Sequence, residues 1–527
     1  MGLDRGAQPT MKVLQWSREI SKKKQGSFVQ KLTKINPKIL QYVLIAIPTF
    51  VYFYYFLNKC LVIYDEGYIL EASRLVHLGK VPYRDFYFQY TPLTVWLGAF
   101  WFKIFGVGII KLRWLALLIS LASITVGYTI ASKIFVKSIA IMVTFGLIAW
   151  GFPHTNFLWP SAVAILFLFL LIYSLIKFTE THKSSYLFLS GVLVALSLLT
   201  KQNLGVANLV GSIAYIFYLR LRNKSVINYW WFLAGFFPIF IYSIFNLSIN
   251  PQNISGFREF FSRSLEVAAG KTLFAPYPII INLEMNLKGV LKYIGKSFIY
   301  LFPLVLYITS AFFAVKKRPQ EKVWYLIFFL TSLHFFALMW PISDLAHLTF
   351  GVPALILMVA GFSLFNYDFW KKISKVLLVI LMLIGFYKTF FMRYYTFETP
   401  YLLQTKETII KEERFYLDEK YFVIVNGLSE LKTSLFKGKT VFAHSYMPMF
   451  YYLIDQTSPT YDLYTVHSLL STAAQRKVIS ELKEKKIDFV IFETWRENNS
   501  PNLITKYIKD NYKKIDEIWD YDVLERI

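Results

Sequence analysis

Two adjacent acidic residues, Asp65 and Glu66, follow the first long apolar run of this 527-residue chain. Ionisable side chains beside a membrane-spanning segment gain nothing from packing against lipid, and they are commonly kept for function. A carboxylate in such a place can accept a proton from a hydroxyl group, as a general base does. Asp65 and Glu66 are therefore the first candidates for catalytic residues.

More polar groups lie shortly after this acidic pair. Pro82 and Pro92 break any helix there, and Arg84 and Asp85 add charges between them, near the same plane. Arg84 and Asp85 could instead form a mutual ion pair that only staples the loop. The candidate substrate-binding residues of this segment are Tyr83, Arg84, Asp85 and Tyr90.

The composition indicates that the chain lies in a membrane. Its residues are 56% hydrophobic and 19% aromatic, more apolar than soluble domains usually are. The formal charge of +24 comes from basic residues in short clusters between apolar stretches, as in cytoplasmic loops, which argues against nucleic-acid binding. The single cysteine, Cys60, excludes a disulfide framework and a thiol-based metal site.

The apolar runs predict about eleven transmembrane helices, since a span needs about 17 to 25 apolar residues. They begin near residues 39, 111, 138, 160, 186, 205, 229, 295, 322, 347 and 374. A further run, residues 92–105, is too short for a comfortable span and contains Lys103. We expect it to lie in the membrane interface.

The basic clusters decide which loops face the cytoplasm. If residues 92–105 do not cross, most clusters share the side of the basic segment 1–38, as the positive-inside rule requires. The N-terminus is then cytoplasmic. Residues 68–78 read as an interfacial helix that Gly79 ends. The segments predicted to face outward are 64–90, 153–159, 250–288, 341–347 and everything after about residue 393.

A small soluble domain follows the last span. From about residue 396 the composition becomes polar and charged. The runs 421–425, 440–443 and 488–492 read as strands, and 471–485 and 503–512 as helices. The predicted domains are a cytoplasmic segment 1–38, a transmembrane domain 39–395 and an extracytoplasmic α/β domain 396–527.

The ordered motifs of the first part of the chain resemble a known family. They are the acidic pair, a short helix, residues 79–86 (GKVPYRDF), 90–93 (YTPL), 103–106 (KIFG) and Leu112-Arg113. This combination resembles the membrane glycosyltransferases of the GT-C superfold. Within them it is most similar to the protein O-mannosyltransferase-like family, which includes the lipid A aminoarabinose transferases. The resemblance is strongest over residues 60–205.

The resemblance implies a role for the acidic pair. In that family an acid of the first outward loop is the catalytic base, which corresponds to Asp65, or else to Glu66. Displacing a lipid phosphate from a sugar needs such a base, together with positive charge for the leaving phosphate. A carboxylate opposite the leaving group suits inversion. Many relatives carry a second acid in the next outward loop, but residues 153–157 read PHTNF here, which puts a two-carboxylate or carboxylate–metal arrangement in doubt.

Three further outward sites carry candidate substrate-binding residues. Lys201 ends an apolar helix on the outward side, where the positive-inside rule disfavours a lysine. Similar relatives carry a lysine at the corresponding helix end, and binding the carrier phosphate is the role that this resemblance implies. Lys201 could instead snorkel to the lipid headgroups. Asp344 and His347 lie one helical turn apart, although Asp344 could be an ordinary helix N-terminal charge. His154 could contact substrate or simply be solvated. The remaining candidates are Gln202, and Arg258, Arg263 and Lys271 of the segment 250–288.

These observations predict an all-α polytopic membrane protein with the GT-C fold and a C-terminal soluble α/β domain. The predicted activity is transfer of a sugar, hexose or pentose, from a polyprenyl-phosphate donor to a hydroxyl of a protein, glycan or lipid acceptor. The expected location is a prokaryotic plasma membrane, with the reaction at its extracytoplasmic face. The sequence identifies no cofactor with certainty and leaves the participation of a divalent metal open. The alternatives are a transporter or lipid flippase, which usually places ionisable groups at mid-bilayer, and an inactive scaffold.

Overall fold

A computed structural model describes most of the chain. The described residues are 37–223, 228–248, 251–269, 286–317, 321–340, 342–392, 399–466, 470–494 and 502–527. They fall into two compact units, Met1–Tyr52 and Phe53–Ile527. The described part of the first unit belongs to the apolar helix α2 (Pro37–Tyr54). The other helices and all of the strands belong to the second unit.

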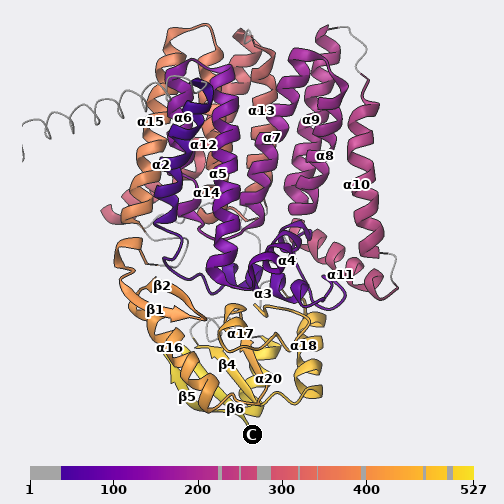
Figure 1. Cartoon of the computed structure of the whole chain (residues 1–527), viewed down its shortest axis with the longest axis vertical. Coiled ribbons are helices and arrows are strands. Elements are labelled where there is room, and N and C mark those ends of the chain that lie inside the picture. The colour runs from indigo at the N-terminus through magenta and orange to yellow at the C-terminus, as the bar shows by residue number, and fades with distance from the viewer. Residues whose placement is uncertain are drawn as a thin grey trace, which may run out of the picture. The chain divides into compact units, whose positions relative to one another are not determined.

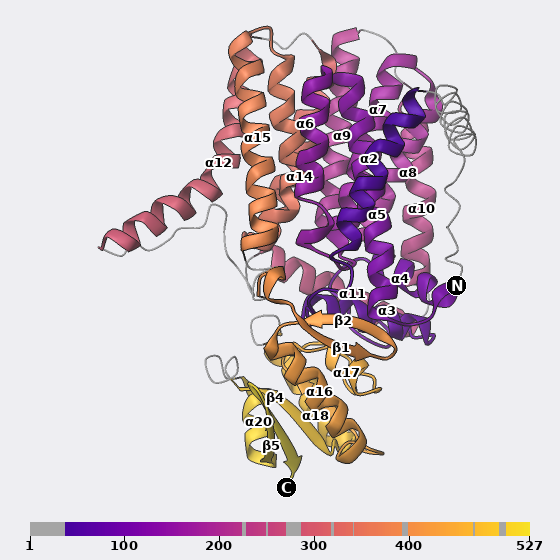
Figure 2. The same cartoon turned by 60° about the vertical axis from the view of Figure 1, so that its left-hand side comes forward.

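The second unit contains a bundle of apolar helices, as Figures 1 and 2 show. Its helices are α5 (Ile109–Ile134), α6 (Lys137–Ala149), α7 (Pro160–Thr181), α8 (Ser184–Thr200), α9 (Gln202–Asn223), α10 (Trp230–Ser248), α12 (Leu287–Lys317), α13 (Lys322–Leu338), α14 (Leu345–Gly361) and α15 (Asp368–Phe391). Together with α2, they place a helix at each predicted position. Among the described residues, α5, α7, α9, α12, α14 and α15 are long and apolar enough to cross a membrane. The chain is an integral, multi-pass membrane protein, and the number of crossings stays a prediction.

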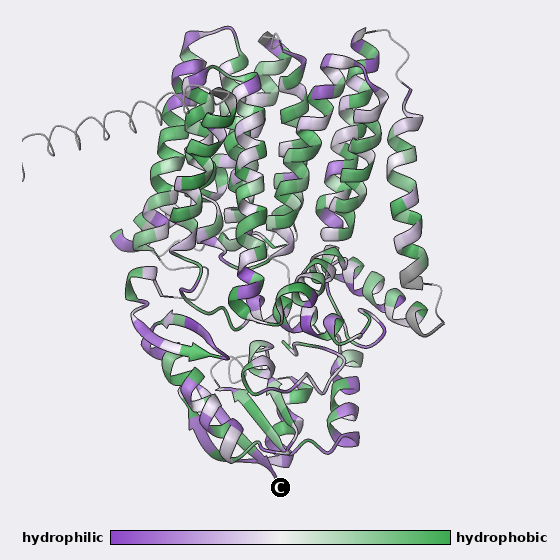
Figure 3. Ribbon diagram, in the orientation of Figure 1, coloured by the Kyte–Doolittle hydropathy of each residue, from purple (hydrophilic) through white to green (hydrophobic). Residues whose placement is uncertain are grey.

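The position of each helix in the bundle follows from its apolar surface. Helix α14 is apolar all round and lies in the interior, with 78% of its most apolar window buried. Helix α15 lies at the periphery, where only 28% of the corresponding window is buried. Figure 3 shows hydrophobic residues along the length of the bundle and hydrophilic residues gathered beyond its ends. This distribution is that of a protein whose outer helices face lipid.

Three further helices form a layer at one end of the bundle (Figures 1 and 2). They are α3 (Asp65–His77), α4 (Leu93–Phe105) and α11 (Pro251–Ala268). Helix α3 begins three residues before its predicted start, so Asp65 and Glu66 occupy its first turn. It ends before Gly79, whose φ of 86° suits a residue without a side chain. Helix α4 is the short apolar helix expected over residues 92–105.

Helix α11 corrects the prediction of a loop over residues 250–288. Its sequence is polar on one face and apolar on the other, which is the pattern of a helix lying on a surface. This stretch read as a loop because its polar face interrupts every apolar run. Residues 270–285 of the predicted loop, which include Lys271, lie outside the described residues.

An α/β region follows the bundle and lies against the α3–α4–α11 layer (Figure 1). Strands β1 (Lys406–Ile410) and β2 (Glu413–Leu417) form an antiparallel hairpin. A second sheet has the strand order β3-β4-β6-β5. Its strands are β3 (Val441–His444), β4 (Phe489–Glu493), β5 (Tyr512–Ile518) and β6 (Tyr521–Arg526), of which β3 and β4 are parallel.

Helices cover this sheet and close its core. Helices α18 (Thr472–Glu484) and α20 (Leu503–Asn511), both predicted, pack their apolar faces onto Val490 and Leu524 of the sheet. The predicted strands at 440–443 and 488–492 are present as β3 and β4. The boundary between the transmembrane and α/β domains stays a prediction, because residues 393–398 lie outside the described part of the chain.

The strand predicted over residues 421–425 is wrong. This stretch lies inside helix α16 (Glu419–Ser434). Asp418 caps the helix by accepting a hydrogen bond of 2.9 Å from the Tyr421 backbone N–H. Buried residues recur at Tyr421, Ile424, Leu428 and Leu431, a helical spacing that continues beyond the β-branched run. The cap and the longer repeat outweigh the local strand propensity.

Candidate functional site

Asp65 begins helix α3 and meets a side chain from the α/β region. The hydroxyl of Tyr446, in the loop after β3, donates a hydrogen bond to Asp65 Oδ1. The rings of Tyr64 and Tyr446 stack with their centroids 5.7 Å apart. Burial raises the pKa of the Tyr446 hydroxyl, and the Asp65 carboxylate raises this pKa further. Tyr446 therefore remains a protonated donor that orients the half-buried carboxylate of Asp65.

Glu66 is turned away from Asp65 and is bound to Arg113 of α5. Arg113 Nε lies 2.5 Å from Glu66 Oε1, and Arg113 Nη2 lies 2.7 Å from Oε2. The same guanidinium donates to the carbonyl oxygens of Leu57, Lys59 and Cys60 at 2.8–3.0 Å. Glu66 and Arg113 are both buried. All of these contacts anchor the chain before α3, and Asp65 is left as the acid that faces the site.

Tyr90 is the point where the predicted site residues converge. The ammonium of Lys201, at the junction of α8 and α9, lies 5.4 Å from the centroid of the Tyr90 ring. Burial raises the pKa of the Tyr90 hydroxyl, and the nearby carboxylates of Asp65 and Asp344 raise it further. Both carboxylates also act electrostatically on Lys201, which is buried and donates a 3.0 Å hydrogen bond to Ser161. The structure therefore brings Asp65, Tyr90, Lys201 and Asp344 together.

Asp344 has a structural contact as well as a place near this site. It caps α14, accepting hydrogen bonds of 2.8 Å from both the backbone N–H and the ring Nδ1 of His347. Both interpretations of Asp344 from the sequence are thus compatible with its position. Among the described residues, no group of three or more histidines, cysteines or acids is arranged to hold a metal ion.

Gln202 ties the junction of α8 and α9 to the layer beneath it. Its side-chain amide donates to the Gln89 carbonyl at 3.1 Å and to Ser264 Oγ of α11 at 3.4 Å. The Tyr464 hydroxyl of the α/β region donates to Gln89 Oε1 at 2.6 Å. The ring of Trp159 packs edge-on against Tyr90, with centroids 5.5 Å apart. The residues around Tyr90 therefore come from the bundle, from the α3–α4–α11 layer and from the α/β region.

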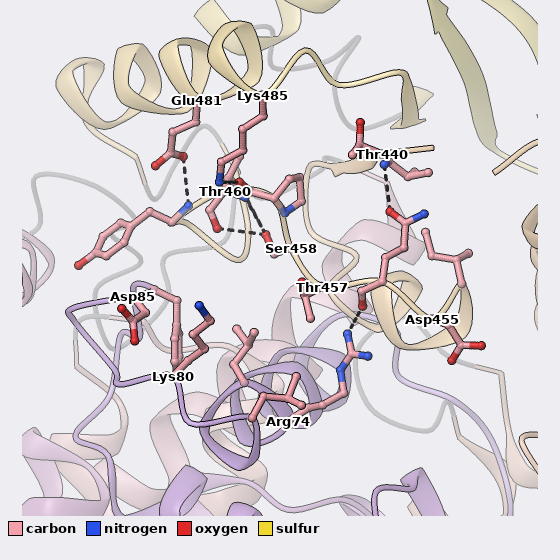
Figure 4. Close-up of a pocket in the computed structure, with 18 of the residues that line it drawn as sticks. Arg74, Lys80, Asp85, Thr440, Asp455, Thr457, Ser458, Thr460, Glu481 and Lys485 are labelled. Carbon is pink, nitrogen blue, oxygen red and sulfur yellow. Dashed lines mark hydrogen bonds between the residues drawn. The ribbon is translucent and has the colours of Figure 1, made fainter. Parts of the chain in front are cut away.

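Tyr83, Arg84 and Asp85 form a tight turn that supports Tyr90. The Tyr83 hydroxyl donates to the Tyr90 carbonyl at 2.6 Å. Arg84 and Asp85 pair with each other at 2.7 Å, which is the simpler of the two predicted roles. The Arg84 hydrogen bond lowers the pKa of Asp85. Both charged side chains line a separate cavity, shown in Figure 4, which does not include Asp65, Tyr90 or Lys201.

Three other predicted residues lie elsewhere. Arg263 of α11 pairs with Asp462 of the α/β region at 2.5 Å and also with Glu259, whereas Arg258 is exposed. His154 is buried and stacks on Trp150, with centroids 5.0 Å apart.

Burial, together with the nearby Lys388 ammonium, lowers the pKa of His154 well below its usual value. Its ring atom Nε2 lies 2.8 Å from the Ala149 carbonyl. The ring of His154 packs against Trp150 and also lines a small cavity within the bundle, and its predicted contact with substrate stays a prediction.

Several site residues were not predicted. Trp159 and Ser161 lie on either side of Pro160, the first residue of α7. Because a span was predicted to begin there on the outward side, the sequence could have indicated both residues. Tyr446 and Tyr464 come from the α/β region, and no local pattern marks them. Their contacts with Asp65 and Gln89 span 381 and 375 residues of sequence.

The bundle, the helical layer and the α/β region together define a polytopic membrane protein with the GT-C fold. The sequence profile of the family described as dolichyl-phosphate-mannose-protein mannosyltransferase matches residues 89–245. This stretch contains Tyr90 and Lys201 and ends before Asp344. A search of curated proteins finds no match.

Solved structures share this fold over nearly the whole chain. ArnT from Cupriavidus metallidurans bound to undecaprenyl phosphate is similar with a TM-score of 0.59 and 11% identity, over 94% of this chain and 98% of that one. The apo state of the same protein gives a TM-score of 0.52 and 12% identity, over 93% and 98%. Archaeal oligosaccharyltransferase AglB from Archaeoglobus fulgidus gives 0.49 and 10%, over 87% and 70%. The similarity to ArnT at these identities establishes the fold.

Proposed function

We propose that this protein transfers a sugar from a polyprenyl-phosphate donor to an acceptor hydroxyl. The observation that carries the proposal is the convergence on Tyr90 of one carboxylate at a helix start, Asp65, and one buried ammonium, Lys201. The reaction needs one group of each kind. The undecaprenyl phosphate bound by ArnT, which has the same fold, supports a lipid phosphate as the leaving group.

Each residue has a defined task in the proposed mechanism. Asp65 takes the proton of the acceptor hydroxyl, and the oxygen attacks the anomeric carbon of the sugar. The bond between that carbon and the phosphate oxygen breaks, and the electron pair leaves with the polyprenyl phosphate. Lys201, held by Ser161, stabilises the charge that develops on this phosphate. Attack opposite the leaving group inverts the anomeric configuration.

The proposed reaction takes place at the extracytoplasmic face. The clusters around Lys133, Lys177 and Lys183 belong to helix ends far from the site. Lys183 precedes α8, whereas Lys201 follows it, so the two lysines lie at opposite ends of one helix. The positive-inside rule puts the cluster at Lys183 in the cytoplasm and the site outside.

The test is a transfer assay with the purified full chain and a polyprenyl-phosphate donor carrying a radiolabelled sugar. We expect Asp65→Asn to lower transfer by about 10²–10⁴-fold, because the amide cannot accept the hydroxyl proton. Asp510→Asn, which neutralises an acid of α20 in the α/β region, should transfer like the unaltered protein. Equal turnover by Asp65→Asn would remove this residue from the mechanism. Movement of the lipid across vesicles without sugar release would favour the flippase alternative instead.

A further inference from the structure

A second candidate site lies at the other end of helix α3. A cavity of about 1280 Å³ opens between the C-terminal end of α3, the turn at 80–86, and the α/β region. Ordinary small-molecule pockets enclose roughly 300–1,000 Å³. In Figure 4, Lys80 and Asp85 lie on the α3 side of this cavity, and Thr460, Glu481 and Lys485 lie on the opposite side. The volume suits an extended ligand better than a single sugar.

The cavity, which we name the α3 cavity, is strongly basic. Eight basic and four acidic side chains line it, a net charge of +4. The basic residues are Arg74, Lys80, Arg84, Lys432, Lys437, Lys439, Lys477 and Lys485.

The acids of the α3 cavity neutralise only some of these charges. Arg84, Lys432 and Lys477 each pair with an acid of the lining, and Arg74 and Lys439 pair with Glu71 and Asp488 outside it. Within the described part of the chain, the exposed Lys80 and Lys437 make no ion pair. A ligand carrying several negative charges would meet uncompensated ammonium groups here.

Arg74 lies at the wall of the α3 cavity, where two contacts fix its side chain. It pairs with Glu71 at 2.7 Å and donates to the Gln456 carbonyl. Glu71 is completely buried and also accepts a hydrogen bond of 3.3 Å from the Ser458 backbone N–H. Burial raises the pKa of Glu71, and the Arg74 guanidinium opposes this effect. The wall of the cavity is therefore preorganised by contacts between α3 and the α/β region.

The lining favours a glycan over a peptide. The hydroxyl groups of Thr457 and Ser458 can accept hydrogen bonds from a sugar, and the ring of Tyr461, which already carries the Lys477 ammonium 3.6 Å from its centroid, adds aromatic surface to the lining. A peptide commonly binds by adding a strand to a sheet edge. At the nearby edge strand β3, however, the backbone N–H groups of Val441 and Ala443 already donate to Gln456 Oε1 and to the Tyr451 hydroxyl.

We propose that the α3 cavity docks an anionic glycan, one bearing a negative charge on several of its sugar units, as the acceptor of the transfer. The inference rests on the proposed function. Helix α3 connects the two sites, since Asp65 begins it and Arg74 lies in its last turn. At 1.5 Å per residue these residues are about 14 Å apart along the helix axis. In this proposal an oligosaccharide of several units, docked in the α3 cavity, extends beyond the residues that line it to present its end to Asp65, which is not among them.

The test is direct binding of labelled hexasaccharides to the full chain in detergent, at low and at raised salt. Fluorescent hexagalacturonate carries one carboxylate on each sugar, and maltohexaose is its neutral counterpart. We expect the charged probe to bind at least tenfold more tightly, and this preference to weaken with salt, because exposed charges are screened. Lys80→Gln/Lys437→Gln should lower its affinity several-fold. Lys506→Gln/Lys513→Gln, which neutralises two exposed lysines outside the cavity, should leave the affinity unchanged.

Three results would overturn the inference. They are equal binding of the neutral probe, unchanged affinity in Lys80→Gln/Lys437→Gln, or equally tight binding of a hexaglutamate peptide. Binding is also measured in Asp65→Asn, where strongly reduced transfer is expected. If Asp65→Asn binds the probe and keeps full turnover, the result counts against the proposed function alone. If Asp65→Asn loses turnover but the unaltered protein does not bind the probe, the result counts against glycan docking in the α3 cavity alone.

Discussion

Asp65 and Glu66 are neighbours in sequence, but their side chains have different surroundings. Asp65 is half-buried, accepts a hydrogen bond from Tyr446, and lies close to Tyr90 and Lys201. Glu66 uses both carboxylate oxygens on Arg113. A general base must be able to reach the substrate proton, and a carboxylate enclosed by a guanidinium cannot do so without breaking the pair. This difference makes the two residues separable by experiment.

Glu66→Gln should destabilise the protein. The neutral amide leaves the buried Arg113 charge without its counter-charge, which costs about 3–5 kcal/mol in comparable buried pairs. Thermal unfolding in detergent should show a clearly lower midpoint for Glu66→Gln and an unchanged midpoint for Asp65→Asn. A Glu66→Gln protein that is as stable as the unaltered one but inactive would mean that Glu66 takes part in the chemistry.

Tyr446→Phe should weaken transfer without unfolding the protein. The change removes the hydroxyl that orients Asp65, and hydrogen bonds to charged groups contribute about 1.5–3 kcal/mol. We expect kcat/KM to fall roughly ten- to a hundredfold. Tyr451→Phe is the matched control, because it removes a buried hydroxyl of the same region that contacts Ala443 and not Asp65. A similar loss of kcat/KM in both variants would indicate a general structural effect.

The sequence allowed half of this site to be anticipated. Asp65, Lys201 and Asp344 are charges at the ends of apolar runs, and such charges stand out because lipid does not tolerate them. Tyr446 carries no such signal, since tyrosine is common and its loop follows an ordinary strand. Its role depends on a tertiary contact across 381 residues. For Glu66 the sequence suggested too much, because its pattern could not distinguish an acid bound to Arg113 from the candidate catalytic acid Asp65.

At the scale of elements, a buried ion pair joins α11 to the α/β region. Arg263 and Asp462 are both buried, and the Arg263 guanidinium also lies 4.1 Å from the centroid of the Tyr87 ring. Arg263→Met leaves Asp462 buried and unpaired, so it should cost about 3–5 kcal/mol of unfolding free energy. The double change Arg263→Met/Asp462→Leu should recover most of this loss. A double-mutant cycle of unfolding free energies measures the coupling, and additive losses would contradict it.

The elements were predictable to the extent that their own sequences determine them. Apolar runs long enough to span lipid stand out by composition, and a helix occurs at each predicted position. Helix α11 was missed because its apolar residues occupy only one face, and α16 was misread because five residues with strand propensity open a longer helical repeat. The β1–β2 hairpin escaped notice because its turn residues, Lys411 and Glu412, are not typical of tight turns although both have positive φ.

At the scale of the whole molecule, the distribution of charge predicts which way the site faces. The net charge of +24 is concentrated partly in clusters at the ends of spans, and Lys133 of α5 pairs with Glu180 of α7 at 2.9 Å, so these two helix ends lie together. Lys183 belongs to the same end, because it closely follows α7 and precedes α8. Lys201 at the far end of α8 belongs to the site. The positive-inside rule therefore predicts that the site, at the opposite helix ends from these lysine clusters, faces the extracytoplasmic side.

Cysteine labelling in intact cells tests this orientation. The single cysteine of the chain, Cys60, is buried and can be replaced by alanine to remove background labelling. In that background, Lys506→Cys in the α/β region should react with a membrane-impermeant maleimide in intact cells. Lys183→Cys, which is also exposed, should react only after the cells are permeabilised. The reverse pattern would place Asp65 and Lys201 in the cytoplasm, where the proposed extracytoplasmic transfer cannot occur, because both residues lie at the end of the bundle that carries the α/β region.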